Sequence, residues 1–502
     1  MRRSVKTTVL TALSIALASC AAVGPDFEPP QAEVPEGWTQ ETGTAVSTAP
    51  QELVEWWRVF DDPVLDDLVE AARRNNNTLQ VAGLRVLEAQ AQLGIARGLR
   101  FPQVQAASGE ASYISPPETS GVNDRYWQLG AGAGISWEID FWGRFQRGIE
   151  AADAAYLASV AAYDQAQVLL TAAVVNAYTV IRTIEEQLEI ARQNVKIQQR
   201  SYEITEVLYR NGSDSELDMQ QALTLLLSTQ ATIPALETSL VQAQNALSTL
   251  IGEAPGSVRQ RLETGSGMPA LPETVAIGAP ADMLRQRPDV RQAEYLAMAQ
   301  NAAVGLAEAD LYPSFSLTGS IGVSTTTLGD ADFGDLFSTD ALTWSVGPSV
   351  VWPFLNYGRI KNNVRVQDAR LQQALVSYRE TVLQAAREAE DAMASFLGSR
   401  TEHDLLVKTV ESAIRSNELA TLRYREGFSD YERVLNSQQA LFNQQQRYIS
   451  NQGDIVLSLV DLYKALGGGW QTRDGAPYID PGTLEMMNDR TDWGDLIQTG
   501  ND

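Results

Sequence analysis

Residues 209–212 read Tyr209-Arg210-Asn211-Gly212, and residues 424–427 read Tyr424-Arg425-Glu426-Gly427, 215 positions later. Both motifs interrupt long segments rich in Ala, Gln, Leu, Glu and Arg, which are good helix formers. Glycine after Asn or Glu is a helix C-cap signal, and residues 213–216 (Ser-Asp-Ser-Glu) supply N-cap side chains for a new helix. The pattern predicts two long helical hairpins, each turning at one of these motifs.

Proline placement supports these hairpins. The chain has 20 prolines, but only Pro234 lies between residues 118 and 254, and none lies between residues 354 and 476. Proline lacks an amide donor and clashes with the preceding helical turn, so its absence indicates helix interiors. The first arms are predicted over residues 143–211 and 358–426, roughly 100 Å each at 1.5 Å per residue. Pro234 is expected to kink its helix without ending it, because the apolar pattern continues on both sides.

The chain is an internal duplication. Phe141-Trp142-Gly143-Arg144 corresponds to Asn356-Tyr357-Gly358-Arg359 at the same offset of 215. A first repeat is predicted over residues 63–287, with a strand pair near 103–141, a helical hairpin over 143–252 and a linker at the equator of the helical part. A second repeat is predicted over residues 288–470, with strands near 313–354 and a hairpin over 358–467. Residues 20–62 are expected to form a tether, and residues 471–502 an equatorial C-terminal tail.

Apolar side chains on the long helices lie on two flanks. Leu188, Val195 and Tyr202 form one heptad column, and Ile190, Ile197 and Ile204 form a second, about 200° away around the helix. A short helix precedes each strand pair, and the first one together with the descending arm of its hairpin nearly equals an ascending arm in length. These features favour a cylinder of helices with neighbours on both sides. A helix buried in a bundle core is the alternative, but charged residues intervene between the columns.

The predicted strands have one apolar face. Residues 128–139 alternate apolar side chains with Gly, Ser, Gln and Glu, and residues 315–323 and 344–352 follow a similar pattern. Aromatic residues lie near the strand ends: Tyr126, Trp127, Trp142, Trp344 and Trp352. The pattern is typical of a membrane β-barrel with aromatic girdles, with a soluble, half-buried sheet as the alternative. Four strands cannot close a barrel and an open edge is not tolerated in lipid, so we expect three chains to build one twelve-strand barrel.

The N-terminus carries a secretion signal. Arg2, Arg3 and Lys6 precede an apolar stretch over residues 9–18, which predicts a signal peptide over residues 1–19. Leu17-Ala18-Ser19-Cys20 is similar to a bacterial lipobox, and Cys20 is the only cysteine in the chain. We therefore expect Cys20 to be lipidated, which provides firm membrane attachment when several acyl chains are present. An ordinary cleavage site that happens to precede a cysteine is the alternative.

Composition excludes several classes of function. The formal net charge of −25 argues against nucleic acid as a partner. One Cys and one His provide neither a disulfide nor a Cys- or His-based metal site, and no nucleophile–base pair can be assigned. No enzyme activity, cofactor or bound metal is predicted. We find no apolar run of 18 residues in the mature chain, so no helical membrane span is expected.

Several motifs, in order, resemble the TolC-like outer-membrane factor family, and in particular its lipoprotein efflux branch of the OprM or NodT type. They are Cys20-Ala-Ala-Val-Gly-Pro-Asp-Phe-Glu-Pro-Pro30, Asp140-Phe-Trp-Gly-Arg144, Leu284-Arg-Gln-Arg-Pro-Asp-Val-Arg291, the motif at 424–427 followed by Tyr431, Val434, Leu435 and Gln438, and Leu466-Gly-Gly-Gly-Trp470.

The resemblance implies an α plus membrane β fold: a homotrimeric channel-tunnel with a twelve-strand outer-membrane β-barrel above a twelve-helix periplasmic α-barrel. It also implies a lipid-anchored protein of a Gram-negative outer membrane. Its partners would be a periplasmic adaptor protein and an inner-membrane pump of the RND type, and its function the passive exit of drugs or other toxic small molecules. An exit duct for type I protein secretion and a non-conducting structural lipoprotein remain alternatives.

The resemblance also implies roles for the hairpin tips. Expected adaptor contacts are Tyr209, Asn211, Gly212, Tyr424, Glu426, Gly427 and Tyr431. In the family an acidic residue of a Leu-Asp-Ala-Gln motif constricts the entrance, but here the corresponding residues are Leu435-Asn436-Ser437-Gln438. Asn436 therefore lacks the carboxylate, and Asp214 or Asp218 of the first repeat is the candidate to replace it.

Overall fold

The computed structural model describes residues 22–29, 37–39, 46–47, 53–117, 119, 124–265, 267–277, 280–328, 332–471 and 477–496. The predicted signal peptide and Cys20 lie outside these residues. The described chain forms two compact units, Met1–Gln31 with Val86–Ser159 and Gln292–Tyr378, and Ala32–Arg85 with Val160–Arg291 and Arg379–Asp502. Each unit takes segments from both repeats, so the repeats predicted from the sequence are not separate compact bodies.

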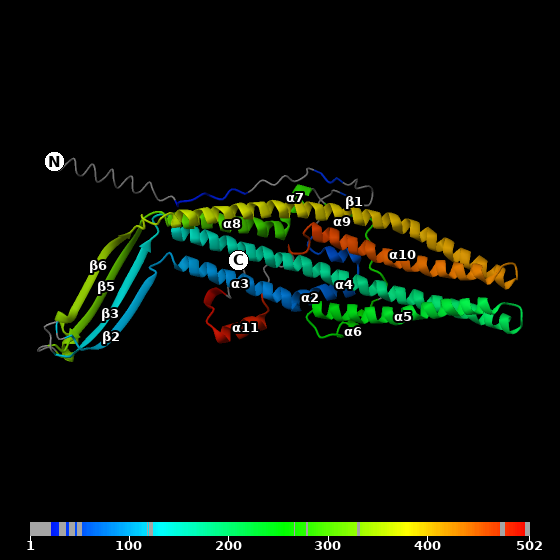
Figure 1. The fold of residues 1–502 in the computed structure, drawn as a ribbon, viewed down its shortest axis with the longest axis horizontal. Coiled ribbons are helices and arrows are strands. Elements are labelled where there is room, and N and C mark those ends of the chain that lie inside the picture. Colours follow the sequence, from blue (N-terminus) through cyan, green and yellow to red (C-terminus); the bar gives the residue numbers. More distant parts are fainter. Residues whose placement is uncertain are drawn as a thin grey trace. The chain divides into compact units, whose positions relative to one another are not determined.

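The two first arms begin and end within one residue of their predicted bounds, and the helical part of each hairpin ends two residues earlier than predicted. Helices α4 (Arg144–Arg210) and α9 (Arg359–Arg425) have 67 residues each, and α5 (Glu216–Leu250) and α10 (Tyr431–Ala465) have 35 each. Pro234 lies inside α5, which continues past it as predicted. Figure 1 shows α4 turning into α5 and α9 turning into α10.

The remaining elements are short. They are β1 (Val46–Ser47), η1 (Trp56–Phe60), α2 (Pro63–Asn75), α3 (Asn77–Gly98), α6 (Arg259–Leu262), β4 (Val275–Ala276), α7 (Pro280–Gln286), α8 (Pro288–Ala309), η3 (Phe333–Phe337), η4 (Thr339–Ala341), α11 (Pro481–Arg490) and η6 (Gly494–Leu496). The short helix before the first strand pair, α3, begins at Asn77, because Asn76 caps it: the Asn76 side chain accepts from the Leu79 amide at 2.9 Å.

In the first unit, four strands form one antiparallel sheet in the order β2-β3-β5-β6 (Figure 1). They are β2 (Val104–Ile114), β3 (Tyr126–Ile139), β5 (Ser314–Thr326) and β6 (Leu342–Val351). Strands β3 and β5 join the two repeats, and Gly132 faces Gly322 in their register. Strands β2 and β6 each have one neighbour, so the sheet has two open edges.

In the second unit, the core lies where the helices meet end to end. The Asn76 side chain donates to the Leu250 carbonyl at 2.9 Å, so α3 begins beside the end of α5. Trp56 stacks on Tyr463 with ring centroids 5.1 Å apart, and both side chains are buried. The predicted end-to-end arrangement of short helix and descending arm therefore holds for the first repeat.

Helix α4 corrects one expectation. Among the helices in the described residues, it alone contains an 18-residue window that is long and apolar enough to cross a membrane, and 61% of that window is buried inside the protein. The sequence prediction that no such stretch exists was therefore wrong. The helix is apolar here because it carries packing surfaces on two flanks, which raises its mean hydropathy without requiring lipid.

Candidate functional site

The sheet of the first unit has one apolar and one polar face. The register aligns Ile135, Gly319 and Val346 across three strands on one face, and Gly134, Ser320 and Ser345 on the other. The apolar side is exposed, with Val346 at 66% and Trp344 at 72%. The other side is small and polar, and the Ser320 and Ser345 hydroxyl oxygens lie 2.8 Å apart. An exposed apolar face of this size is typical of contact with lipid.

The predicted girdle residues lie at both ends of the sheet. Tyr126, Trp127 and Trp344 lie near the ends of strands that meet the 115–125 and 327–341 connections, and Trp142 and Trp352 lie at the opposite end. Trp142 donates from Nε1 to the Pro313 carbonyl at 2.8 Å and stacks on Tyr312. Trp352 likewise donates to the Leu311 carbonyl at 3.1 Å. The role of these five residues in an aromatic girdle remains a prediction.

In the second unit, each hairpin turns through a left-handed glycine. Gly212 has φ +73° and Gly427 has φ +75°. The Gly212 amide donates to the Tyr209 carbonyl and the Ser213 amide to the Leu208 carbonyl, both at 2.9 Å, and Gly427 and Phe428 repeat the pattern. This is a Schellman motif, which ends a helix and satisfies its last carbonyls. The glycines are required by the turn itself, since nothing lies within 4 Å of an added Cβ at either position.

The two tips are bridged by a tyrosine and an aspartate. The Tyr424 hydroxyl on α9 donates to the Asp214 carboxylate in the α4–α5 turn. Asp218 lies one turn into α5, where Ser215 caps the helix: the Asp218 amide donates to Ser215 Oγ at 3.1 Å, and Ser215 Oγ donates to the Asp218 carboxylate at 2.6 Å. The Tyr424 ring packs edge-on against Tyr431, with centroids 5.3 Å apart.

This cluster has perturbed acid–base properties. Burial raises the pKa of Asp214, and Asp218 raises it further, whereas the hydrogen bond from Tyr424 lowers it. Burial and the neighbouring carboxylates Asp218 and Asp214 raise the pKa of Tyr431 to about 12. Burial and the bond to Asp214 also raise the pKa of Tyr424. Both tyrosines are therefore neutral at physiological pH, and Tyr424 donates its hydroxyl proton to Asp214.

The structure sorts the predicted tip residues into two groups. Exposed residues are Tyr209, Asn211, Gly212, Glu426 and Gly427, which stay predicted adaptor contacts. Tyr431 is only 1% exposed and packs with Ala222 and Val434; its predicted role in adaptor contact stays a prediction. Tyr424 is half-buried. Phe428, which sequence reasoning missed, is 71% exposed at the second tip.

The candidate constriction residues separate in the same way. Asp214 and Asp218 meet at the bridge between the tips, whereas Asn436 is exposed on α10 and forms no hydrogen bond with either of them. The first-repeat carboxylates, and not Asn436, thus carry the charge at the cluster. Their role in a constriction remains a prediction.

A model of the outer membrane efflux protein family matches the chain twice, over residues 68–253 and 279–468. The two matches cover more than half of the sequence and one falls on each repeat.

This chain belongs to the outer membrane efflux protein family.

Curated relatives match this efflux protein over nearly its full length. It is 30% identical to the cation efflux system protein CusC of Escherichia coli over 460 residues, which cover 91% of this chain and 98% of CusC. It is 31% identical over 491 residues to a protein of Pseudomonas putida called probable efflux pump outer membrane protein TtgC, covering 95% of this chain and 97% of that one.

Solved structures of outer-membrane channels have the same fold as this efflux protein. The channel OprN matches with a TM-score of 0.83 and 30% identity, covering 90% of this chain and 100% of OprN. The open state of the Neisseria gonorrhoeae channel MtrE matches with a TM-score of 0.77 and 29% identity, covering 90% and 99%.

A polar ladder joins α4 to α10 in this efflux protein, and sequence reasoning missed it. Three α4 residues spaced seven apart each pair with α10: Gln187 donates to Ser450 at 3.0 Å, Asn194 donates to Gln445 at 2.7 Å, and Ser201 accepts from Gln438 at 2.6 Å. The Ser201–Gln438 pair is buried and the other two are partly buried, and such pairs fix the register of two helices more strictly than an apolar seam. The heptad spacing was the signal that could have revealed the ladder.

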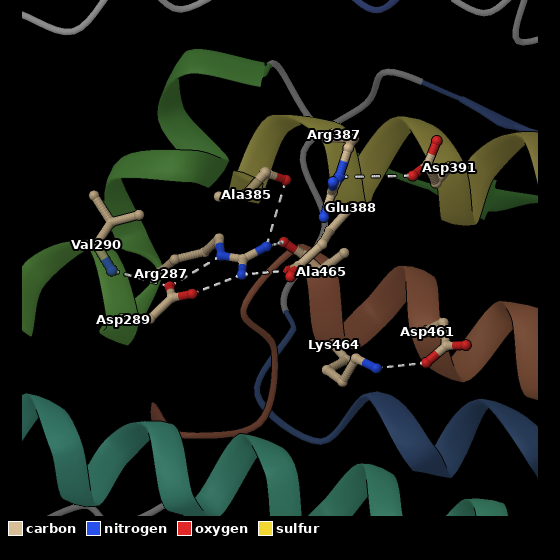
Figure 2. Close-up of polar contacts among 10 residues, drawn as sticks. All are labelled: Arg287, Asp289, Val290, Ala385, Arg387, Glu388, Asp391, Asp461, Lys464 and Ala465. Carbon is tan, nitrogen blue, oxygen red and sulfur yellow. Dashed lines mark hydrogen bonds and ion pairs between the residues drawn. The ribbon is translucent and has the colours of Figure 1, made fainter. Parts of the chain in front are cut away.

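Arg287 is a second residue that the sequence analysis did not single out. Figure 2 shows its guanidinium between α8, α9 and α10. It donates to the Ala465 carbonyl at 2.6 Å, to Asp289 at 2.7 and 3.0 Å, and to Glu388 at 2.7 Å, with only 5% of its side chain exposed. Because Ala465 is the last residue of α10, Arg287 satisfies an orphan carbonyl at that helix end. Asn76 has the same role in the first repeat, where its side chain donates to the Leu250 carbonyl at the end of α5.

Proposed function

We propose that this protein is the outer-membrane exit duct of a tripartite efflux system, formed by three copies of the chain. The observation that carries the proposal is the four-stranded sheet with one exposed apolar face and two open edges. Unpaired strand edges cannot remain in the hydrocarbon region of a membrane, because each unsatisfied backbone group costs several kcal/mol there. Pairing β6 of one copy with β2 of the next removes every edge when three copies close a ring.

The same symmetry extends to the helices. Three copies contribute six long helices, and the shorter helices that meet end to end complete six more, which gives a twelve-helix barrel continuous with the strands. The polar, small-residue face of each sheet then lines a water-filled lumen, and the apolar face contacts lipid. The lumen requires no catalytic group, and transport through it is passive.

The proposed partners follow from the two ends of the duct. The exposed tip residues Asn211, Gly212, Glu426 and Gly427 are the surface offered to a periplasmic adaptor, which connects the duct to an inner-membrane pump of the RND type. The Tyr424–Asp214 bridge joins residues next to this surface in sequence, which supports a role in holding the entrance narrow until the adaptor docks. Lipidation of Cys20 anchors the assembly in the outer membrane of a Gram-negative cell.

The proposed cargo is drugs or other toxic small molecules. Relatives carry names that refer to cation, antibiotic, toluene and solvent efflux. Among the described residues, no group of three or more His, Cys, Asp or Glu side chains is placed to hold a metal ion. A lumen lined by small and polar side chains suits a duct that leaves substrate selection to its pump.

Planar-bilayer recording tests the proposal. Purified protein is expected to give discrete, long-lived single-channel currents that are small at rest and grow when the tip bridge is removed by Tyr424→Phe. Protein that inserts into the bilayer but never conducts, with or without the substitution, contradicts the duct and favours a structural lipoprotein.

A further inference from the structure

A groove of about 510 Å³ lies between the two arms of the first hairpin. Helices α4 and α5 form two of its sides, and α6 forms a third. Its lining includes the apolar side chains of Leu188 on α4, Leu240 and Val241 on α5, and Leu262 on α6. Ligand pockets have volumes of about 300–1,000 Å³, so the groove is large enough for a small organic molecule.

Arg182 is buried at this groove, with only 2% of its side chain exposed. Its Nη1 donates to Glu185 at 2.8 Å, and its Nη2 donates to the Leu262 carbonyl at 3.2 Å. Its guanidinium carbon lies 4.9 Å from the centroid of the Tyr178 ring. Glu185 and Leu262 also line the groove, so the guanidinium lies in the groove wall. The third donor, Nε, is buried and has no acceptor among the residues that the structure describes.

The unmatched Nε of Arg182 indicates what a ligand must provide. A buried donor on a charged group is costly when it has no acceptor. A hydrogen bond between a guanidinium and a carboxylate is about twice as strong as one between neutral groups. The groove therefore combines a buried donor that favours an anionic oxygen with an apolar lining that favours a hydrocarbon body.

The other charges of the groove lie toward solvent. Arg192 on α4 pairs with Glu237 on α5 at 3.1 Å, and about half of each side chain is exposed. Arg259 on α6 and Glu263 directly after it also line the groove, and both are exposed. These two residues carry opposite charges and lie four positions apart, so they can be tested as a matched pair.

We propose that this groove is a binding site for an amphiphilic carboxylate, a small organic acid with an apolar body. Its carboxylate accepts from Arg182 Nε, and its apolar body packs on Leu240, Val241 and Leu262. The ligand contacts both arms of the first hairpin and stabilises it, because a molecule that binds only the folded state shifts the folding equilibrium toward that state. The site is independent of the proposed duct, since both arms belong to one chain.

Equilibrium dialysis with radiolabelled octanoate tests the site on the full-length protein in lipid nanodiscs, with empty nanodiscs as the baseline. Saturable binding of one octanoate per chain is expected. Octanol and octylammonium have the same apolar body without the carboxylate, and each is expected to compete at least about tenfold more weakly. Octanoate binding that does not saturate, or equal competition by either compound, overturns the proposal.

A tryptophan substitution tests the location. Val241 is 43% exposed in the α5 side of the groove, so Val241→Trp fills the groove from its solvent side and should weaken octanoate binding at least about tenfold. Leu227→Trp is the matched control, because Leu227 is 53% exposed on the same helix and lies outside the groove lining. Equal affinity in these two variants, compared as assembled trimers, overturns the proposal.

Arg259→Gln and Glu263→Gln test the sign of the ligand's charge. Arg259→Gln is expected to weaken octanoate binding about two- to threefold, and Glu263→Gln to strengthen it by a similar factor, because both charges are exposed and screened. Both residues lie on the surface, so neither substitution removes a buried contact. Responses in the reverse directions, or no response in either variant, overturn the proposal.

Discussion

The phenolic oxygen of Tyr424 donates a hydrogen bond to the carboxylate of Asp214, 210 residues earlier in the chain. The bond joins the second hairpin to the first at their tips, and its two partners come from different repeats. Because the exposed turn residues lie within three positions of each partner, a force that separates the tips must break this bond. If the proposed entrance lies at these tips, the strength of this contact is expected to set how readily they separate.

Substitution Tyr424→Phe removes the donor and keeps the ring that packs on Tyr431. Loss of one partly exposed hydrogen bond is expected to weaken the tip by about 1 kcal/mol per chain. Opening at the tip then becomes roughly fivefold more frequent, which hydrogen exchange of residues 208–218 measures directly. Tyr448→Phe is the control, because the Tyr448 hydroxyl only accepts from Gln452 on its own helix at 3.0 Å. Equal exchange in both variants would show that the bridge does not hold the tips.

Acidification is expected to stabilise the folded tip, because protonation removes the cost of burying the ionised Asp214 carboxylate. The pKa of Asp214 lies above its ordinary value of 3.8, chiefly because of burial. A raised pKa means that the protonated form is favoured in the folded tip; its stabilising contribution is full below pH 3.8 and is lost as the pH rises through the raised value. Channel opening should therefore decline as the pH is lowered from 7 toward 4. Asp214→Asn should remove this dependence, and a profile that it leaves unchanged would assign the titration to another group.

Of the two arginines labelled in Figure 2, Arg287 is expected to contribute more to the stability of the protein than Arg387. Arg287→Met leaves the Ala465 carbonyl, Asp289 and Glu388 without their common donor and should destabilise the protein by about 3 kcal/mol or more. Arg387→Met is the matched control, because its side chain is 69% exposed and lies 3.9 Å from Asp391, so its loss should cost less than about 0.5 kcal/mol. Thermal unfolding in detergent compares them. Equal unfolding temperatures would show that Arg287 is not a structural link.

Arginine substitutions at two adjacent residues, one on each face of the sheet, are expected to have opposite effects on membrane insertion. Val346→Arg places a charge on the apolar face and should cost about 2–4 kcal/mol of insertion free energy near the bilayer centre. Ser345→Arg, one position earlier in β6, faces the polar side and should insert normally. The measurement is the fraction of protein that acquires protease resistance in lipid vesicles. Efficient insertion of both, or of the Val346 variant alone, would contradict the assignment of lipid and lumen faces.

The sequence predicted the elements of this fold because their signals are local. Proline exclusion and the cap motifs at Gly212 and Gly427 located the two first arms to within one residue, and strict alternation located β3. The open sheet followed from the same alternation. These signals depend on local backbone chemistry, so they do not require contacts with residues that are distant in the sequence.

The polar contacts could not be predicted in the same way. In the sequence alone, Arg147 and Arg287 look like ordinary solvated arginines. Only their long-range partners show that both are buried. The burial of Tyr431 against Ala222 could not be predicted, because the sequence does not tell which flank of α10 meets α5. The Asp214 side chain was a candidate, but its partner Tyr424 became evident only when the two tips were placed together.

Native mass spectrometry of the detergent-solubilised, full-length protein tests the central claim most directly. An assembly of three chains that survives dilution is predicted, because four strands with two open edges are incomplete alone. A stable single-chain species at every concentration, with its strands protected from hydrogen exchange, would contradict the account.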